Sequence, residues 1–254
     1  MASFSTSAIV LRRIDYGDYD LILSLLTPGH GKLAVMAKAA KRSKKRFGGI
    51  LELFSDLEVV CSAGRTQGLS MLVEASLRNP YFNIRVDIKK MAYASYWAEL
   101  INIWVEEGQQ QAALYTLLQY VLQKLDQGDV SEELLSILFQ MKFLSVSGLC
   151  PSLDHCCTCK CEIDQLTDKT VVLDHAKGGL VCEDCLPYQT QHRPLSKGTI
   201  KQLRWIERNE LPKAVRIRFS SPGLTEGLAF LEAFVPYHLG KEPRSLKFLQ
   251  KLRG

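Results

Sequence analysis

Four cysteines in two matched pairs are the residues whose spacing most clearly indicates chemistry. Cys156 and Cys159 form one C-x-x-C pair, Cys182 and Cys185 form the other, and 22 residues separate the pairs. Two residues between ligands let the chain turn so that both sulfurs reach one metal ion, and a second turn completes a tetrahedron. Four thiolates leave no open coordination position, so the sequence predicts a structural Zn²⁺.

Other interpretations of these cysteines stay open. A redox-active C-x-x-C or a set of disulfides would use the same residues. Further thiols and imidazoles lie close in the sequence and are nominal alternative ligands: Cys150, His155, Cys157, Cys161 and His175. The spacing alone assigns no role to Cys61, Cys150, Cys157 or Cys161.

The segment between the pairs predicts a short hairpin. Residues 171–173 are a β-branched run, Gly178 and Gly179 indicate a turn, and residues 180–181 can return as the partner strand. Two cysteine turns on one hairpin are the layout of a zinc ribbon, which we expect at about residues 150–190.

A basic run near the N-terminus is the second chemical signal. Six of the nine residues in 38–46 are Lys or Arg, and no acidic residue occurs between Leu21 and Leu51. Such clusters neutralise phosphates, although a solvated loop is the ordinary alternative. The aromatic residues Tyr16, Tyr19 and Phe47 can offer stacking faces to unpaired bases, or belong to a core. The predicted DNA-binding residues are Arg13, Lys32, Lys38, Lys41, Arg42, Lys44, Lys45 and Arg46.

The segments on either side of this basic run have patterns typical of β-strands. Five short runs with apolar or alternating patterns are separated by turn residues, at 7–13, 20–27, 32–37, 51–59 and 69–77. Five strands in about 75 residues without a long helix predict a small closed barrel, the OB-fold.

Helical periodicity follows Pro80. Apolar residues recur at three- and four-residue spacing in 88–104 and 114–125, and Ser131 can cap a third helix to about residue 146. We expect these three helices to pack as an antiparallel bundle. Further helices are predicted at 195–208 and near 228–235, and the pattern leaves open the role of a basic amphipathic tail at 241–254.

The fold class expected is therefore α+β, with an OB domain at 1–80 and a helical domain carrying the zinc ribbon at 81–254. The formal charge of +5 is uneven: +4 in 1–80, −3 in 81–149 and +4 in 150–254. Basic ends suggest a polyanionic partner. No apolar run is long enough for a membrane helix and no signal peptide is recognised, so we expect a cytoplasmic location.

The order of these motifs resembles the RecO family of bacterial DNA repair proteins along nearly the whole chain. The resemblance rests on Tyr16-Gly17-Asp18-Tyr19, Gly31-Lys32, the basic loop leading into Phe47-Gly48-Gly49, and the cysteine pairs with Gly178-Gly179. It also includes His238-Leu239-Gly240 with Arg244-Ser245. Lys160 departs from the family, which often has Gly at this position.

The resemblance implies a recombination mediator without enzymatic activity. Such a protein binds single- and double-stranded DNA, anneals complementary strands, and works with RecR to load RecA onto strands coated by single-stranded DNA-binding protein (SSB). It implies contact with the acidic C-terminal tail of SSB, for which we expect a groove edged by Lys89, Lys90 or Lys124, and association with the nucleoid.

Three other functions are compatible with the residues alone. An RNA-binding or ribosome-associated OB and zinc-ribbon protein would share the same parts, and a scaffold would use its charges only for solubility. A metallohydrolase is the weakest alternative, because four Cys ligands leave no position for water.

Overall fold

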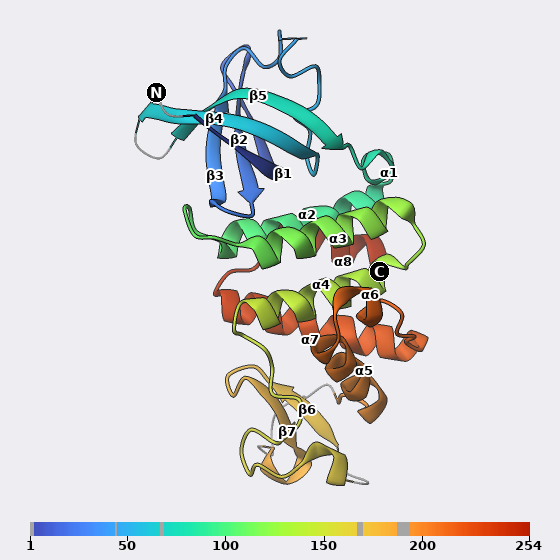
Figure 1. The fold of residues 1–254 in the computed structure, drawn as a ribbon. Coiled ribbons are helices and arrows are strands. Elements are labelled where there is room, and N and C mark those ends of the chain that lie inside the picture. The colour runs from blue at the N-terminus through green and yellow to red at the C-terminus, as the bar shows by residue number, and fades with distance from the viewer. Residues whose placement is uncertain (1–2, 44, 67–68, 167–169, 187–193) are drawn as a thin grey trace. The chain divides into compact units, whose positions relative to one another are not determined.

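The structure, a computed structural model, describes residues 3–43, 45–66, 69–166, 170–186 and 194–254. The chain forms two compact units. The barrel unit comprises residues 1–129 and 243–254, and the ribbon unit comprises residues 130–242. Figure 1 labels the elements of both units. No helix in the described part of the chain is long and apolar enough to cross a membrane.

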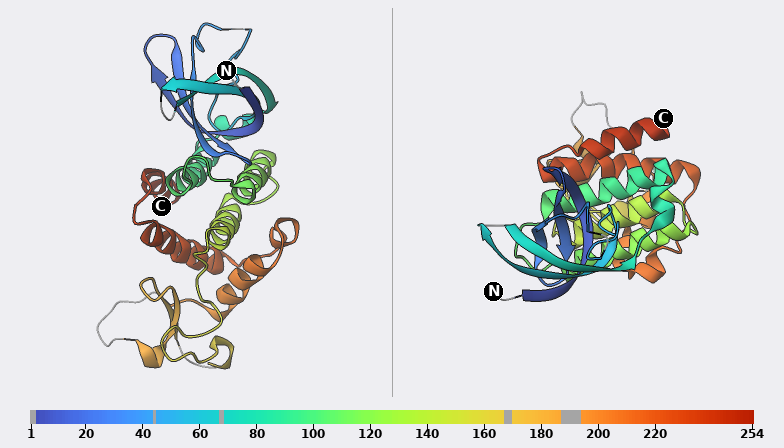
Figure 2. Two further views of the ribbon diagram at one scale, coloured as in Figure 1. Left: turned by 60° about the vertical axis from the view of Figure 1, so that its left-hand side comes forward. Right: turned by 90° about the horizontal axis from the view of Figure 1, so that it is seen from above.

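Five strands close into the barrel that the sequence predicts (Figure 2). They are β1 (Ser3–Tyr16), β2 (Asp20–Thr27), β3 (Gly31–Ala37), β4 (Asp56–Thr66) and β5 (Leu69–Asn79). Their order around the barrel is β1-β2-β3-β5-β4, with β3 and β5 parallel and the other pairs antiparallel. The α+β class with an N-terminal five-stranded OB barrel is thus confirmed.

Every second side chain along the strands points into the barrel and fills its interior. Leu21, Leu23 and Leu25 of β2 point inward and are buried, because successive side chains of a strand face opposite sides. The same period places buried residues on the neighbouring strands: Ala8, Val10, Val35, Ala37, Leu57, Val59, Cys61 and Leu72.

The fourth strand differs from the prediction. It begins at Asp56, whereas alternation in the sequence placed a strand from residue 51. Leu51 and Phe54 are buried, but Phe54 has a left-handed backbone (φ 68°) and the segment before Asp56 is irregular. The alternation there reflects side chains that cover the core from a loop.

Four helices complete the barrel unit: α1 (Phe82–Arg85), α2 (Ile88–Trp104), α3 (Ala112–Gln127) and α8 (Arg244–Arg253). Asp87 caps α2 by accepting the backbone N–H groups of Lys89 and Lys90, at 2.8 and 3.1 Å. The basic tail whose role was open is α8, which lies alongside α2 (Figures 1 and 2).

A buried carboxylate joins the barrel to α3. Asp56, at the start of β4, accepts hydrogen bonds from Tyr115 Oη at 3.0 Å and Gln119 Nε2 at 2.8 Å. Burial and the nearby Asp56 charge raise the pKa of Tyr115, so its hydroxyl stays protonated and donates. The barrel is therefore held on its helices by a polar contact as well as by apolar packing.

The ribbon unit contains α4 (Glu132–Val146), α5 (Lys197–Arg208), α6 (Leu211–Ala214), α7 (Ser221–Leu239) and the hairpin β6 (Val171–Asp174) and β7 (Gly179–Cys182). Two short 3₁₀ turns, Ile163–Gln165 and Glu183–Cys185, flank the hairpin. α4 packs against α7 and α5 within this unit, whereas α2 and α3 pack together in the barrel unit. The Ser131 cap is confirmed: its Oγ accepts the N–H of Leu134.

Candidate nucleic-acid interface and metal centre

The basic run forms an ordered cap at one end of the barrel. Ala40, Phe47 and Leu51 are buried in the barrel core, so the described residues 38–43 and 45–51 pack onto the barrel instead of projecting as a free loop. Phe47 is 1 % exposed, which removes it as a stacking face for bases. Tyr16 is 53 % exposed and remains available, whereas Tyr19 is 39 % exposed and has the Arg42 guanidinium over its ring.

Hydrogen bonds tie this basic cap to the β1–β2 turn. The N–H of Lys41 donates to the carbonyl of Tyr19 at 3.0 Å, and the N–H of Ala39 donates to Asp20 Oδ1 at 2.7 Å. Lys41 Nζ forms an ion pair with Asp15 at 3.0 Å. The two exposed tyrosines and the basic run therefore form one surface, although 18 residues lie between Tyr19 and Lys38 in the sequence.

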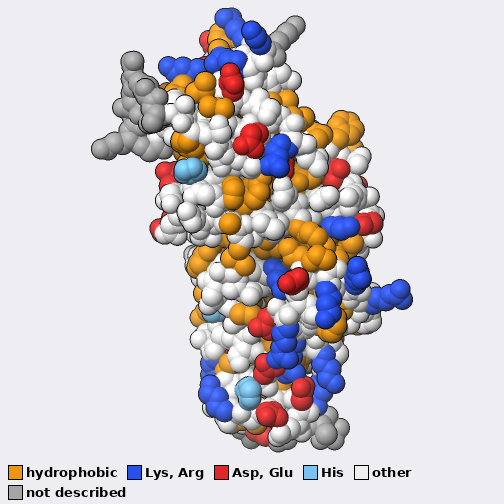
Figure 3. Space-filling view, viewed as in Figure 1, with side chains coloured by type: hydrophobic (Ala, Val, Ile, Leu, Met, Phe, Trp, Pro, Cys, Tyr) orange, Lys and Arg blue, Asp and Glu red, His pale blue; other side chains and the backbone are white. Residues whose placement is uncertain are grey.

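The cations of the cap differ in what they contact. The Arg42 guanidinium lies 3.3 Å from the centre of the Tyr19 ring, and Arg46 donates to the carbonyl of Lys38. Lys38 and Lys45 are exposed and make no ion pair among the described residues. Lys44 lies outside the described residues. Figure 3 shows the basic side chains gathered at this end of the barrel.

Two predicted DNA-binding residues have structural partners elsewhere. Arg13 forms an ion pair with Glu52 at 3.4 Å. Lys32 lies at the other end of β3 from Lys38, and its Nζ donates to the carbonyl of Asn102 at 2.9 Å, near the C-terminus of α2. Because that end of a helix has unpaired carbonyls, Lys32 acts as a cap inside the barrel unit.

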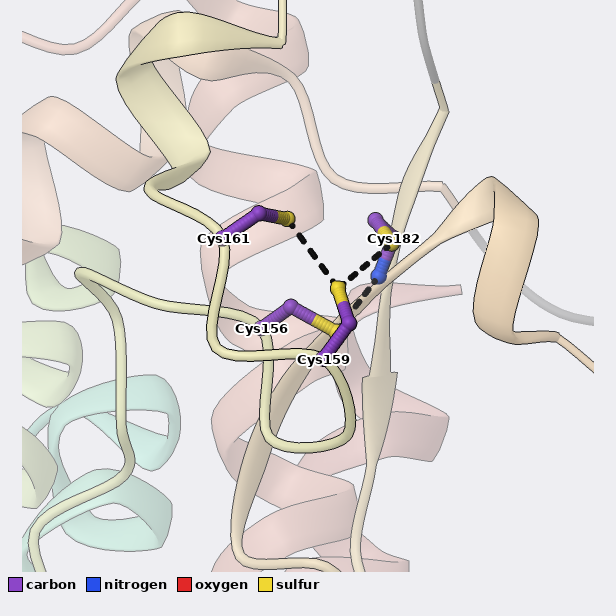
Figure 4. A group of neighbouring side chains, drawn as sticks. All are labelled: Cys156, Cys159, Cys161 and Cys182. Atoms are coloured by element: carbon purple, nitrogen blue, oxygen red, sulfur yellow. Dashed lines mark hydrogen bonds between the residues drawn. The ribbon is translucent and has the colours of Figure 1, made fainter.

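The cysteines of the ribbon gather around one point (Figure 4). The Sγ atoms of Cys156, Cys159, Cys161 and Cys182 all lie within 4.8 Å of one another. Cys159 Sγ is 3.3 Å from that of Cys161 and 3.6 Å from that of Cys182. The group contains three of the four predicted ligands, Cys156, Cys159 and Cys182. Its fourth member is Cys161, which was not predicted because it belongs to neither C-x-x-C pair.

The hairpin positions these thiols as the glycine signal predicts. Gly178 adopts a left-handed conformation (φ 73°) and turns the chain from β6 to β7, which pair from Val171↔Cys182 to Asp174↔Gly179. Cys182 therefore ends β7, and Cys185 ends the 3₁₀ turn that follows.

The chemistry of the group suits thiolates. Cys156 Sγ accepts two backbone N–H groups, from Thr158 and Cys182, each at 3.4 Å. Burial alone would raise the pKa of Cys156, but backbone hydrogen bonds from Cys182, Cys159 and Thr158 lower it to about 6. Donors that stabilise a sulfur anion are what a metal-binding turn provides, so the residues present fit a metal ion such as Zn²⁺.

Other cysteines have different surroundings. Cys61 is buried in the barrel core, where burial raises its pKa to about 11, and Cys150 Sγ donates to Glu207 Oε1 at 3.2 Å. All eight cysteines are free thiols. Cys185 ends the 3₁₀ turn Glu183–Cys185 and is not one of the four cysteines in the close group.

The ribbon is fastened to α5 by buried charge. Arg204 donates to the carbonyl of Leu153 and forms ion pairs with Asp154 at 2.9 Å and Asp164 at 2.8 Å, and Arg208 also pairs with Asp154. Both arginines lie on α5, in the segment that the sequence predicts as a helix at 195–208. Arg204 is buried and therefore structural, since breaking its ion pairs would leave a buried charge without a partner, whereas the Arg208–Asp154 pair is exposed.

Comparisons with known proteins cover the whole chain. Sequence models described as "Recombination protein O N terminal" and "Recombination protein O C terminal" match residues 1–81 and 85–247. The chain is 48% identical over 258 residues to the DNA repair protein RecO of Desulfosudis oleivorans, covering 100% of this chain and 99% of that protein. It is 43% identical over 254 residues to the RecO of Desulfatibacillum aliphaticivorans, covering 100% and 98%, respectively.

Proposed function

Because the chain belongs to the RecO family of DNA repair proteins, we propose that it is a recombination mediator that anneals complementary DNA strands and, with RecR, helps load RecA onto SSB-coated strands. We further propose that it binds single- and double-stranded DNA and the C-terminal tail of SSB, and that it is not an enzyme. The domain boundary near residue 80 and the predicted site residues are part of this proposal.

The single observation that carries the proposal is the basic cap. An annealing protein must accept any sequence, so it must hold strands mainly through phosphates. The cap presents cations on a rigid surface, because buried Phe47 and Leu51 fix its backbone to the barrel. Tyr16, exposed at the end of β1, offers an unpaired base a flat face beside these cations.

A metal ion in the ribbon would serve a structural role. Cys156, Cys159 and Cys182 would hold it. The fourth ligand would be Cys161, which belongs to the close group, or Cys185, which completes the second C-x-x-C pair. When bound, the metal would cross-link the two cysteine-bearing segments, and we propose that it is zinc.

The test is annealing of two complementary oligonucleotides, each precoated with SSB, with and without the protein. Lys38→Glu combined with Lys45→Glu changes two exposed cations of the cap that make no ion pair among the described residues. We expect the acceleration of annealing to fall at least about tenfold. The salt dependence of single-strand binding should weaken by roughly 0.7 in slope for each lost phosphate contact.

Lys201→Glu combined with Lys241→Glu is the matched control, because both residues are exposed in the ribbon unit and the net charge changes equally. Equal loss of annealing in both double variants would mean that only net charge matters. Unchanged annealing in the cap variant would overturn the proposed interface. A preference of the wild type for structured RNA would instead support an RNA-binding function.

A further inference from the structure

The last part of β1 has two sides with different surroundings. Its pairing with β2 shifts just before Arg12, which marks a β-bulge. After the bulge, Arg12 lies opposite Ser24, and Arg13 lies opposite Leu23, which is buried in the barrel. Directly opposite residues of two paired strands point to the same side of the sheet. Arg12 and Arg13 are neighbours in the sequence, and they therefore point to opposite sides of β1.

The inner side of this segment, which Arg13 shares with the buried leucines of β2, is occupied by the basic cap. Arg13 forms an ion pair with Glu52 at 3.4 Å, and Asp15, on the same side, forms one with Lys41 at 3.0 Å. Lys41 belongs to the cap, and Glu52 follows it directly in the sequence. The charged groups on this side thus already have partners within the protein.

The outer side has no such cover. Arg12, Ile14 and Tyr16 follow one another along it and are exposed, and Arg12 makes no ion pair among the described residues. Ile14 lies opposite Ile22 of β2, which in turn lies opposite Met36 of β3, and both are partly exposed. These five residues form an apolar strip across three strands, with an aromatic ring at one end and a cation beside it, and we call it the outer strip.

The composition of the outer strip suits the bases of an unpaired DNA strand. Aromatic rings and the guanidinium plane stack on bases without regard to sequence, and a cation also attracts the phosphates. Asp20, opposite Tyr16, is the one acidic residue among the paired positions of this side, and its Oδ1 accepts the N–H of Ala39 at 2.7 Å. In a duplex the faces of the bases are covered by their neighbours in the stack, so the strip could not reach them.

We propose that the outer strip binds the bases of single-stranded DNA and gives the protein a preference for single-stranded over double-stranded DNA. The inference rests on the DNA-binding function proposed above and assigns the specificity of that function to residues outside the predicted set, Arg12 and Ile14 above all. The cap contacts phosphates, which both forms of DNA carry, so it contributes to affinity for both and distinguishes them little. The two sides of β1 thus have separate roles.

The first test uses the wild-type protein and three ligands: an oligothymidine, a strand of equal length without bases, and a duplex. The abasic strand keeps the phosphates, so any difference between it and the oligothymidine measures contacts to bases. We expect the oligothymidine to bind at least about tenfold more tightly than the abasic strand. This comparison does not depend on how any variant folds.

The second test removes the strip. Tyr16→Ala and Ile14→Thr should each lower the affinity for the oligothymidine, Tyr16→Ala by at least about fivefold, and leave the affinities for the abasic strand and the duplex within about twofold of the wild type. Tyr16→Phe should retain the wild-type affinities, because its ring still stacks. Leu77→Thr is the matched control for Ile14→Thr: Leu77 is 42 % exposed and Ile14 is 38 % exposed, and Leu77 lies on β5 opposite Leu57.

The adjacent arginines provide a comparison at equal charge. Arg12→Gln should lower the affinity for the oligothymidine more than the affinity for the duplex, whereas any loss in Arg13→Gln should be the same for both ligands. The cap variant, Lys38→Glu with Lys45→Glu, should weaken the binding of all three ligands, because each of them carries phosphates.

Equal affinities of the wild type for the oligothymidine and the abasic strand would overturn the inference. Equal losses of single-strand and duplex binding in Tyr16→Ala and Ile14→Thr would overturn it as well. Annealing of SSB-coated strands is measured separately. A wild type that prefers bases without accelerating annealing would support the outer strip and refute the mediator function, and a wild type that binds none of the three ligands would refute both.

Discussion

Gly31 is the residue where the β2–β3 turn meets the connection between α2 and α3. Its backbone is left-handed (φ 61°), and a Cβ atom there would collide with the carbonyl of Gln109. We expect Gly31→Ala to lower the free energy of unfolding by roughly 2–4 kcal/mol, because it adds backbone strain and breaks this close approach. Urea unfolding measures the loss.

Gly29→Ala is the matched control, since nothing lies within 4 Å of its Cβ position. It should change the stability by less than about 0.5 kcal/mol. Similar midpoints for the two variants would show that the close approach at Gly31 does not contribute.

Glu226 makes the stability of the ribbon unit depend on pH. Its carboxylate accepts hydrogen bonds from the N–H of Ser196 at 3.0 Å and from Thr199 Oγ1 at 2.7 Å, at the start of α5. Burial alone would raise the pKa of Glu226, but these hydrogen bonds lower it below its usual value. A lowered folded-state pKa means that the stabilisation is present above the unfolded pKa and is lost as pH falls through the folded pKa.

Glu226→Gln should therefore lower the stability of the ribbon unit by about 1 kcal/mol at neutral pH, and the difference from the wild type should shrink below about pH 4. Thermal unfolding at a series of pH values gives the comparison. Glu74→Gln, at an exposed residue of β5, should leave the pH profile unchanged. A constant difference between Glu226→Gln and the wild type at all pH values would contradict the charge argument.

The structural role of a residue was predictable from the sequence where the spacing of neighbouring residues determines it. It was not predictable where the role depends on a partner far away in the sequence. The alternation of Leu21, Leu23 and Leu25 predicted their burial. The roles of Arg13 and Lys32 depend on Glu52 and Asn102, which no local pattern connects to them. Cys161 was set aside because one-residue spacing from Cys159 breaks the paired motif, yet a left-handed Lys160 turns its thiol inward.

At the scale of elements, α8 depends on a carboxylate of α2. Glu99 accepts the backbone N–H groups of Arg244 at 3.1 Å and Ser245 at 2.9 Å, where α8 has unpaired donors and the positive end of its dipole. We expect Glu99→Ala to destabilise the docking of α8 by about 1–2 kcal/mol. Hydrogen exchange should then accelerate in residues 244–253.

The comparison variant for this prediction is Glu74→Ala, which removes an acid from an exposed strand position of the same unit. Exchange in residues 244–253 should be unaffected by it. If Glu99→Ala also left exchange in α8 unchanged, apolar packing through Leu246 and Leu249 would be sufficient to hold the helix.

Element boundaries were less predictable than element types. The helices 88–104 and 131–146 follow from periodicity and caps, and the structure confirms them as α2 and α4. α7 begins at Ser221, before the apolar stripe that marked it, because Ser220 caps it and Pro222 is tolerated in its first turn. The start of β4 was misplaced because buried loop residues imitate strand alternation.

At the scale of the whole molecule, the proposed DNA interface and the proposed metal site belong to different units. Removing the metal with a chelator should therefore increase hydrogen exchange in residues 152–164 and 171–185, while the barrel strands keep their protection. Single-strand affinity should change by less than about twofold, because the basic cap is fixed to the barrel core. Loss of DNA binding together with metal would instead show that the ribbon contributes to the interface.

The division into units was the least predictable feature. Three consecutive helical stripes favoured one bundle, but α4 packs with α5 and α7, whereas α8 packs with α2. Periodicity identifies which face of a helix is buried and contains no information about which other helix covers it.

The position of α8 in the barrel unit has a consequence for how the protein is made on the ribosome. The barrel, α2 and α3 leave the exit tunnel before the ribbon unit, and α8 follows it. At ordinary rates of elongation the delay is on the order of ten seconds. During that time the apolar surface of α2 that later contacts Leu246 and Leu249 stays uncovered, so the nascent chain is open to chaperones and to mispairing until its last helix emerges.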